Sequence, residues 1–403
     1  MINYFLTLFF KRSVMSEDKF KEIRPYKGEE EAAALARIAA HPILKDISNY
    51  LFPGKDPNDL KHLISSLKSV EEFQAKVMLF AIKKIVSDTA KNLTYSGLEK
   101  LHDGSARLLI SNHRDIMLDS AIIQAILHIN NIPTSEMAVG DNLVTDPFME
   151  DVARSNKMIK VIRTGNPREL YKYSSILSEY IRESIGTGRS SVWIAQRNGR
   201  TKNGVDITEQ GLLKMFDMSG SGCFKEDFGK LSITPVSISY EYEPCDFLKA
   251  RELFISRRTK YKKSPGEDLN SILTGLMQHK GNIHIHFCEV INEQELAECA
   301  GQEKNEKFKM LAEVIDKRIY STYRIWNTNM IAYDMLNSSN VFSSMYTEEE
   351  YKAFDEYCEL KISGFEGDRA EIKDIFLSIY ANPVTNSGVN PVSQLHPVEG
   401  TES

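Results

Sequence analysis

A histidine followed by a nearby aspartate is the pair of residues in this chain best suited to proton transfer. Residues 107–119 read RLLISNHRDIMLD, which places His113 and Asp119 in one short segment. A histidine takes and returns a proton near neutral pH, and a carboxylate can hold its ring and stabilise the imidazolium cation. The pair therefore indicates a general base that activates a hydroxyl group.

A simpler interpretation of this pair stays open. A histidine close to a carboxylate often occurs by chance, and a polar residue in front of a helix is usually only a cap. Asp115 is a second candidate for the carboxylate partner, although Asp119 is favoured because Ser120 closes the block directly after it. The order of the blocks downstream favours the catalytic interpretation.

Three further blocks combine buried strands with cations or special backbone. Residues 158–163 read MIKVIR, a strand that ends in Arg163, and residues 192–204 read VWIAQRNGRTKNG, a strand that opens into a cationic, glycine-containing loop. Guanidinium groups and loop amides together suit a phosphate group. A base combined with an anion site predicts transfer onto a phosphorylated alcohol. The fourth block, residues 233–239, reads ITPVSIS and has Pro235 near its start.

The elements that must position these blocks alternate between strand and helix. Apolar runs of strand length predict strands at 108–111, 136–139, 158–162, 191–195, 233–240 and 283–290, and helical spacing predicts helices at 115–129, 146–155 and 168–185. Such alternation is typical of an α/β fold with a largely parallel central sheet covered by helices on both faces. His113 would then lie at a strand-to-helix junction, where ligand crevices form.

Helices flank this α/β part on both sides. We expect an N-terminal helical cap over residues 1–105, the α/β domain over 106–300 and C-terminal helices packed on it over 301–381. The tail 382–403 carries Pro383, Pro391 and Pro397 among polar residues and is expected to be disordered.

The four blocks, in this order, resemble the glycerolipid acyltransferase family, which includes glycerol-3-phosphate and 1-acyl-glycerol-3-phosphate acyltransferases. The resemblance covers about 108–240. It implies acyl transfer from acyl-CoA or acyl-carrier protein to a glycerol-type hydroxyl in phospholipid biosynthesis, with no metal, no cofactor and no covalent intermediate. It also implies a dyad of His113 and Asp119 and substrate-binding roles for the residues at the positions of the other blocks, namely Arg163, Asn198, Gly199, Arg200 and Pro235.

The chain departs from the family pattern at two positions. Five residues separate His113 from Asp119 where the family has four, so a turn before the helix must absorb one residue. Asn198 stands where the family carries a glutamate, which removes a negative charge near the acceptor. Two alternatives follow: an acceptor that is a non-phosphorylated or amino-acid lipid, or an inactive homologue that only binds lipid or acyl carrier.

Composition restricts the partners. A formal net charge of −6 argues against general nucleic-acid binding, and the five cysteines show no paired spacing typical of a zinc site or a disulfide framework. The scattered cysteines fit a reducing cytoplasm. His284 and His286 share one strand face, but a metal needs a third ligand, so we expect hydrogen-bonded residues on a half-exposed edge strand.

Two segments suggest peripheral attachment to a membrane. Residues 2–10 are apolar and aromatic but too short to span a bilayer, and serve as an anchor unless translation begins at Met15. Residues 249–263 interleave cations with aromatic and aliphatic side chains, which suits either an anionic lipid surface or a solvated helix end. The helical cap and the start of 116–129 would lodge the acyl chain, unless they are simply core.

Overall fold

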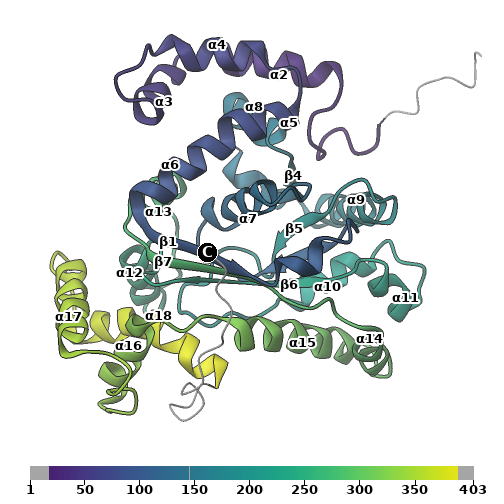
Figure 1. Ribbon diagram of the computed structural model, residues 1–403. Coiled ribbons are helices and arrows are strands. Elements are labelled where there is room, and N and C mark those ends of the chain that lie inside the picture. The colour runs from purple at the N-terminus through teal and green to yellow at the C-terminus, as the bar shows by residue number, and fades with distance from the viewer. Residues whose placement is uncertain (1–17, 145, 389–403) are drawn as a thin grey trace, which may run out of the picture.

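The computed structural model describes residues 18–144 and 146–388. These form a seven-stranded sheet in the order β1-β7-β6-β2-β5-β3-β4 (Figure 1), in which neighbouring strands are parallel except for the antiparallel pair β6 and β7. The strands are β1 (Ala90–Ser96), β2 (Leu108–Ser111), β3 (Glu136–Gly140), β4 (Met158–Val161), β5 (Val192–Ala195), β6 (Thr234–Tyr240) and β7 (Gly281–Phe287). The predicted α/β class with a largely parallel sheet is confirmed.

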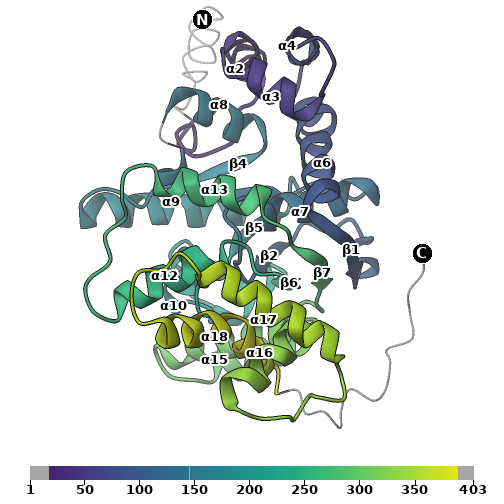
Figure 2. The same ribbon diagram turned by 90° about the vertical axis from the view of Figure 1, so that its left-hand side faces the viewer.

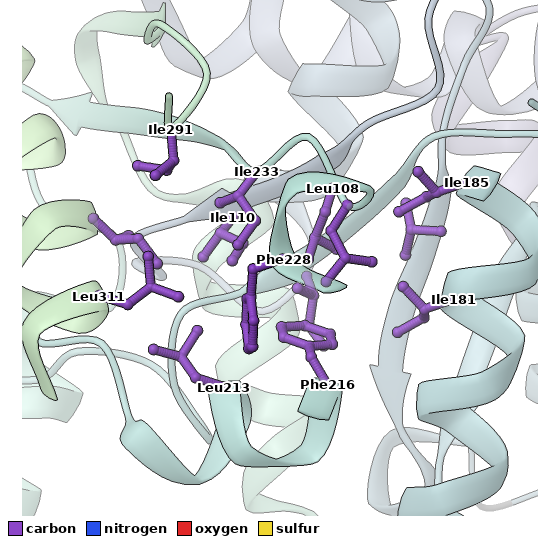
Figure 3. Packing of buried hydrophobic residues seen from close by; sticks show 14 of the residues in the cluster. Leu108, Ile110, Ile181, Ile185, Leu213, Phe216, Phe228, Ile233, Ile291 and Leu311 are labelled. Carbon is purple, nitrogen blue, oxygen red and sulfur yellow. The ribbon is translucent and has the colours of Figure 1, made fainter. Parts of the chain in front are cut away.

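Helices cover both faces of the sheet. On one face lie α6 (Leu79–Thr89) and α7 (Leu118–Ile129), and on the other lie α9 (Pro167–Gly186), α10 (Gln210–Asp217), α11 (Phe224–Gly229), α14 (Glu293–Ala300) and α15 (Glu306–Thr322). The central strand β2 is buried on both sides: Leu108 and Ile110 pack with side chains of α9, α10 and α15 (Figure 3), whereas Leu109 packs with those of α6 and α7. Apolar burial on two faces explains why β2 reads as an uninterrupted apolar run.

The N-terminal α-helices end at residue 89, and only a short 3₁₀ helix at Leu98–Leu101 follows before residue 105. The α-helices are α2 (Glu29–Ala40), α3 (Leu44–Leu51), α4 (Asn58–Ser66) and α5 (Val70–Phe73), and a π-helical stretch at Gln74–Met78 leads into α6. The expected helical region 1–105 is wrong over residues 90–96, which form β1 at the edge of the sheet beside β7. Lys91 and Asn92 within β1 are exposed, so the strand lacks the apolar pattern that would have marked it.

The C-terminal helices form a separate bundle beside the sheet (Figure 2). It is built from α12 (Asp246–Ser256), α16 (Asn327–Asn337), α17 (Glu348–Ile362) and α18 (Arg369–Ser387). The expected disordered tail from residue 382 is wrong up to Ser387, because α18 continues through Pro383 and packs Pro383 and Val384 inward. Residues 389–403 lie outside the described part, as do residues 1–17 with the expected anchor.

The expectation of an edge strand at 283–290 is also wrong. β7 lies between β1 and β6, and His284 is buried there, with its ring nitrogens bonded to the hydroxyls of Thr94 and Ser96. The same hydroxyl of Ser96 also lies within hydrogen-bond distance, 2.7 Å, of Nδ1 of His286. Burial first, then the positive charge of Arg324, lowers the pKa of His284 to about 4, so this histidine is neutral at physiological pH. The expected hydrogen bonding of the two histidines is confirmed.

The interpretation of residues 249–263 as a surface segment is wrong at Lys249. Its side chain is almost fully buried in α12, and its ammonium group bonds Glu243 at 2.6 Å and the carbonyl of Arg114 at 2.7 Å. The later cations of the segment remain exposed. Within residues 18–144 and 146–388, no helix is both long and apolar enough to cross a membrane.

The loop after β5 is held by close contact with α18, and this contact can be tested at Gly204. Gly204 has φ +77°, and a Cβ there would lie 2.3 Å from the carbonyl oxygen of Ile379. We expect Gly204→Ala to lower the free energy of unfolding by about 3 kcal/mol, because the left-handed conformation and the backbone clash both cost energy. Urea unfolding measures this change.

Gly104 is the matched control. Its φ is +74°, and nothing lies within 4 Å of an added Cβ. Gly104→Ala should cost only about 1 kcal/mol, the conformational part alone. Equal losses in the two variants would contradict the packing of α18 on this loop.

Candidate active site

His113 and Asp119 meet at the turn between β2 and α7. The Nδ1 atom of His113 lies 2.9 Å from Oδ2 of Asp119, and the same oxygen accepts the backbone N–H groups of Arg114 at 2.6 Å and Asp115 at 2.9 Å. Because α7 begins only at Leu118, residues 113–117 form a turn that absorbs the extra residue between the pair. The structure therefore brings the two predicted residues together despite their longer spacing.

The second oxygen of Asp119 has its own donor. The hydroxyl of Tyr240, at the end of β6, donates to Oδ1 of Asp119 at 2.8 Å. Burial first, and then the negative charge of Asp119, raises the pKa of Tyr240 well above its ordinary range. The hydroxyl thus keeps its proton, and Asp119 accepts four hydrogen bonds although it is fully buried. Sequence analysis missed Tyr240 because nothing local links it to residue 119.

Asp115, the other candidate carboxylate, has a structural role. Its Oδ1 accepts the backbone N–H groups of Met117 and Leu118 at 2.9 and 2.8 Å, which caps the start of α7. Burial first, and then the nearby Asp119, raises the pKa of Asp115. Asp115 and Asp119 thus accept four backbone N–H groups of the turn between them.

Several contacts fix the turn that carries His113. The side chain of Asn112 pairs with Ile238 of β6, accepting its N–H at 2.8 Å and donating to its carbonyl at 2.9 Å. The carbonyl of His113 accepts the N–H of Thr201 at 2.7 Å. Trp193 of β5 meets the His113 ring edge-on at 6.2 Å between centroids. The imidazole is thereby held from two neighbouring strands.

A buried ionic cluster lies behind this turn. Arg114 is fully buried, and its guanidinium group contacts Asp206 at 2.5 Å and Glu243 at 3.2 Å, while Lys249 pairs with Glu243 at 2.6 Å. Two cations and two carboxylates balance, which a buried charge cluster requires. The members of this cluster come from three different segments, so no local pattern indicates that Arg114 faces inward.

A cavity of about 320 Å³ opens beside His113 at the carboxyl ends of the parallel strands. Most of its lining is apolar and lies on or next to β3, β4, β5, α9 and α10 and in the turn before α7: Ile116, Met117, Met137, Val139, Leu143, Met158, Val161, Ile162, Leu177, Trp193, Leu212 and Met215. The polar lining includes Arg163, Arg197, Asn198 and Glu209. The N-terminal helical cap was expected to hold the acyl chain, but it does not line this cavity. The start of the segment 116–129, which was expected to contribute as well, does line it.

The predicted substrate-binding residues divide into two groups. Arg163 and Asn198 line the cavity with His113, but Gly199 and Arg200 do not. The charge of Arg200 acts instead on Asp115 and Cys245, which places it behind the turn. Pro235 is buried within β6, in register with Ile110, and its carbonyl accepts the N–H of Cys288. The predicted convergence of Arg163 and Arg200 in one cavity is therefore not observed.

Glu209 was missed by sequence analysis. It precedes α10, its carboxylate accepts the N–H of Asn198 at 3.1 Å, and its charge acts on Arg163. A carboxylate therefore stands beside Asn198 although the chain lacks one at position 198 itself. Among the described residues, no group of three or more His, Cys, Asp or Glu side chains is placed to hold a metal ion.

Comparison with known proteins identifies the domain that carries this site. A family model described as Acyltransferase matches residues 92–239. Residues 92–239 therefore form an acyltransferase domain. The match confirms the predicted glycerolipid acyltransferase resemblance and the enzyme class.

The matched region of this acyltransferase runs from β1 through β6 and includes both His113 and Arg163. Among solved structures, the protein is similar to the 1-acyl-sn-glycerophosphate (LPA) acyltransferase PlsC from Thermotoga maritima, with 13% sequence identity and a TM-score of 0.37 over 71% of this chain and 92% of that one. No curated protein sequence matches the acyltransferase significantly.

Tyr240 provides a test of how Asp119 is positioned. Removing one hydrogen bond from a buried carboxylate frees it to shift away from His113, so Tyr240→Phe should lower kcat by about tenfold and leave the KM for the acceptor nearly unchanged. Steady-state kinetics on the purified acyltransferase measure both constants.

Tyr26 is the matched control, because its hydroxyl also donates to a buried carboxylate, that of Asp151, at 2.9 Å. Tyr26→Phe should lower stability without lowering kcat. A Tyr240→Phe enzyme with full kcat would contradict the positioning role.

Proposed function

We propose that this acyltransferase moves a fatty acyl group from acyl-CoA or acyl-carrier protein to the hydroxyl of a glycerol-phosphate-type acceptor in phospholipid biosynthesis. The observation that carries the proposal is the contact of His113 with Asp119 at the mouth of an apolar cavity. A base beside an apolar cavity suits a reaction that joins a polar hydroxyl to a hydrocarbon chain. The formed dyad favours an active enzyme over a binding homologue.

In the proposed mechanism, His113 acts as the general base. Its Nδ1 faces Asp119, which leaves Nε2 to take the proton of the acceptor hydroxyl as that oxygen attacks the thioester carbonyl. The new oxygen–carbon bond forms, the carbon–sulfur bond breaks, and the imidazolium returns its proton to the departing thiolate. Asp119 stabilises the imidazolium, and general-base help of this kind contributes about 10²- to 10⁴-fold.

The cavity supports the assignment of the acyl site. Apolar side chains from five elements line it directly behind His113. A chain placed there leaves water, at about 0.8 kcal/mol per buried methylene group. The thioester carbonyl at the cavity mouth would then lie next to the imidazole. This arrangement places the reacting atoms together through binding of the unreactive chain.

Arg163 supports a phosphate-bearing acceptor. It follows β4, is exposed at the same cavity and can present its planar guanidinium group to a phosphate. Arg197, from the loop after β5, lines the cavity too and replaces Arg200 as the second cation. Two arginines beside one hydroxyl-activating base suit a dianionic head group.

A neutral or zwitterionic acceptor is the second candidate. Glu209 lies near Arg163 and next to Asn198, and its negative charge partly offsets the two arginines. An amino-acid lipid or another non-phosphorylated lipid alcohol would use this carboxylate as a partner for a hydroxyl or ammonium group. Transfer measured across both acceptor classes distinguishes the two proposals.

The base assignment predicts the outcome of His113→Ala. Transfer should fall at least 10³-fold, because both the proton acceptor and the partner of Asp119 are lost. The free energy of unfolding should change by about 1 kcal/mol, since Asp119 keeps its other three donors. Radiolabelled acyl transfer and thermal unfolding provide the two measurements.

His102 is exposed and lies in the same part of the chain, which makes His102→Ala the control for loss of a histidine. It should retain full activity. Substantial turnover in His113→Ala would exclude His113 as the base.

The head-group assignment predicts the outcome of Arg163→Ala. For a glycerol-phosphate acceptor, the KM should rise by about tenfold or more while the KM for the acyl donor stays almost unchanged. Arg168→Ala, which removes an exposed arginine from the first turn of α9, should change neither constant. Unchanged acceptor use in Arg163→Ala would shift the proposal to the neutral acceptors.

A further inference from the structure

Helix α13 (Glu267–Met277) exposes three large apolar side chains. Leu269, Leu273 and Met277 are 58%, 53% and 58% exposed, and their spacing of four residues places them on one face. The buried positions of the helix are instead Ser271 and Gly275. Ile272 and Leu276 are half-buried, so the outer face leaves three other large apolar side chains exposed to solvent, and such a patch is typical of an interaction surface.

The inward face of α13 lies directly on the catalytic turn. A Cβ at Gly275 would be 2.1 Å from Oδ2 of Asp115, and the carbonyl of Ser271 accepts the thiol of Cys245 at 3.1 Å. The small side chains are therefore needed for this close approach. A partner that binds the outer face of α13 would therefore be separated from the catalytic turn only by the helix itself.

A cleft beside α13 leads toward the cavity. Its volume is about 860 Å³, and Ile43 and Leu269 contribute exposed apolar surface to its lining. Leu143 lines both this cleft and the cavity that contains His113. A long apolar molecule bound at α13 could therefore enter this cleft, which adjoins the cavity beside His113.

Cations precede the helix. Arg257, Arg258, Lys260, Lys262 and Lys263 are exposed in the ten residues before α13. Arg257 and Arg258 share the single carboxylate of Glu371, and Lys263 pairs with Asp268. Glu267 also lies in the first turn of α13, so five cations face three carboxylates and this border keeps an excess of positive charge. An apolar helix face bordered by excess positive charge is complementary to an anionic bilayer surface.

We propose that the outer face of α13, with the exposed cations of residues 257–263, is the surface on which this acyltransferase docks to anionic membrane lipid. The inference rests on the proposed function, because it supplies the lipid acceptor to the same site. Leu269, Leu273 and Met277 enter the bilayer interface, the cations contact the lipid phosphates, and the cleft takes a lipid from the membrane toward His113. An acidic acyl-carrier protein is the other partner that such a surface admits, and the experiment distinguishes the two.

The test compares vesicle binding of the full chain with that of Leu269→Gln/Leu273→Gln/Met277→Gln. Vesicles are phosphatidylcholine with or without phosphatidylglycerol, and co-sedimentation gives the partition coefficient. The triple variant should bind anionic vesicles at least about tenfold more weakly, because three exposed apolar side chains no longer leave water. Lys260→Gln/Lys262→Gln should lower binding by roughly tenfold at low salt, and less at high salt.

Leu360→Gln is the matched control, because Leu360 is 72% exposed on α17, in another part of the molecule. Its binding should equal that of the unchanged protein. In addition, Leu273→Trp should show blue-shifted fluorescence on addition of anionic vesicles. Equal vesicle binding by the triple variant, or no binding by the unchanged protein, overturns the proposal. Loss of acyl-carrier-protein binding with vesicle binding intact assigns the surface to that protein instead.

Activity measurements separate this inference from the proposed function. With a short-chain, monodisperse acceptor, the triple variant should keep full turnover, and with the acceptor embedded in vesicles it should lose about tenfold. Absence of transfer by the unchanged protein to any acceptor would contradict the proposed function and leave the vesicle-binding result as the measure of docking. Equal loss with both acceptors would show that α13 acts on the turn and not on docking.

Discussion

The buried carboxylate of Asp119 is the constraint around which the site is built. An isolated ionised carboxylate cannot be buried without a large loss of hydration energy. Here the backbone of the turn, His113 and Tyr240 supply four hydrogen bonds. Satisfying this one group therefore fixes the path of residues 113–117, the orientation of the imidazole and the position of the end of β6.

The buried charges behind the catalytic turn also need partners, and this need fixes the direction of Arg114. Arg114 faces away from the substrate side because Asp206 and Glu243 need a cation, and Lys249 completes the balance. The loop of Asp206 is in turn bound by α18, whose Asn382 and Asn386 donate to the carbonyls of Asn203 and Gly204. Contacts thus run without interruption from the C-terminal bundle to the residue next to His113.

Local patterns in the sequence were enough to predict much of the fold. The strands β2 to β6 have buried apolar runs, and α9 has a proline and a capping asparagine at its start, so their positions were predicted within one or two residues. β1 was missed because an exposed edge strand needs no apolar run, and the helical end at residue 387 was missed because tertiary packing outweighs the effect of Pro383.

The site divides along similar lines. His113 and Asp119 are close in sequence, and Arg163 ends a recognisable strand, so spacing was sufficient to predict that the first two lie together and that Arg163 lies at a strand end. Tyr240 and Glu209 act through contacts across the sheet and across a loop, and such contacts are invisible in a single sequence. The position of Arg200 was predicted wrongly because its local sequence suits an anion-binding loop. In the folded chain, its positive charge lies near Asp115 and outside the cavity.

The contact of α18 with the loop at Asn203 and Gly204 has a consequence for the order in which the enzyme matures. The partners of this loop lie 179 and 182 residues later in the chain. Domains generally fold from the N-terminus during synthesis, so the sheet and the dyad residues emerge from the ribosome long before α18. The loop beside Arg114 therefore lacks the donors Asn382 and Asn386 until the last helix of the chain has been synthesised.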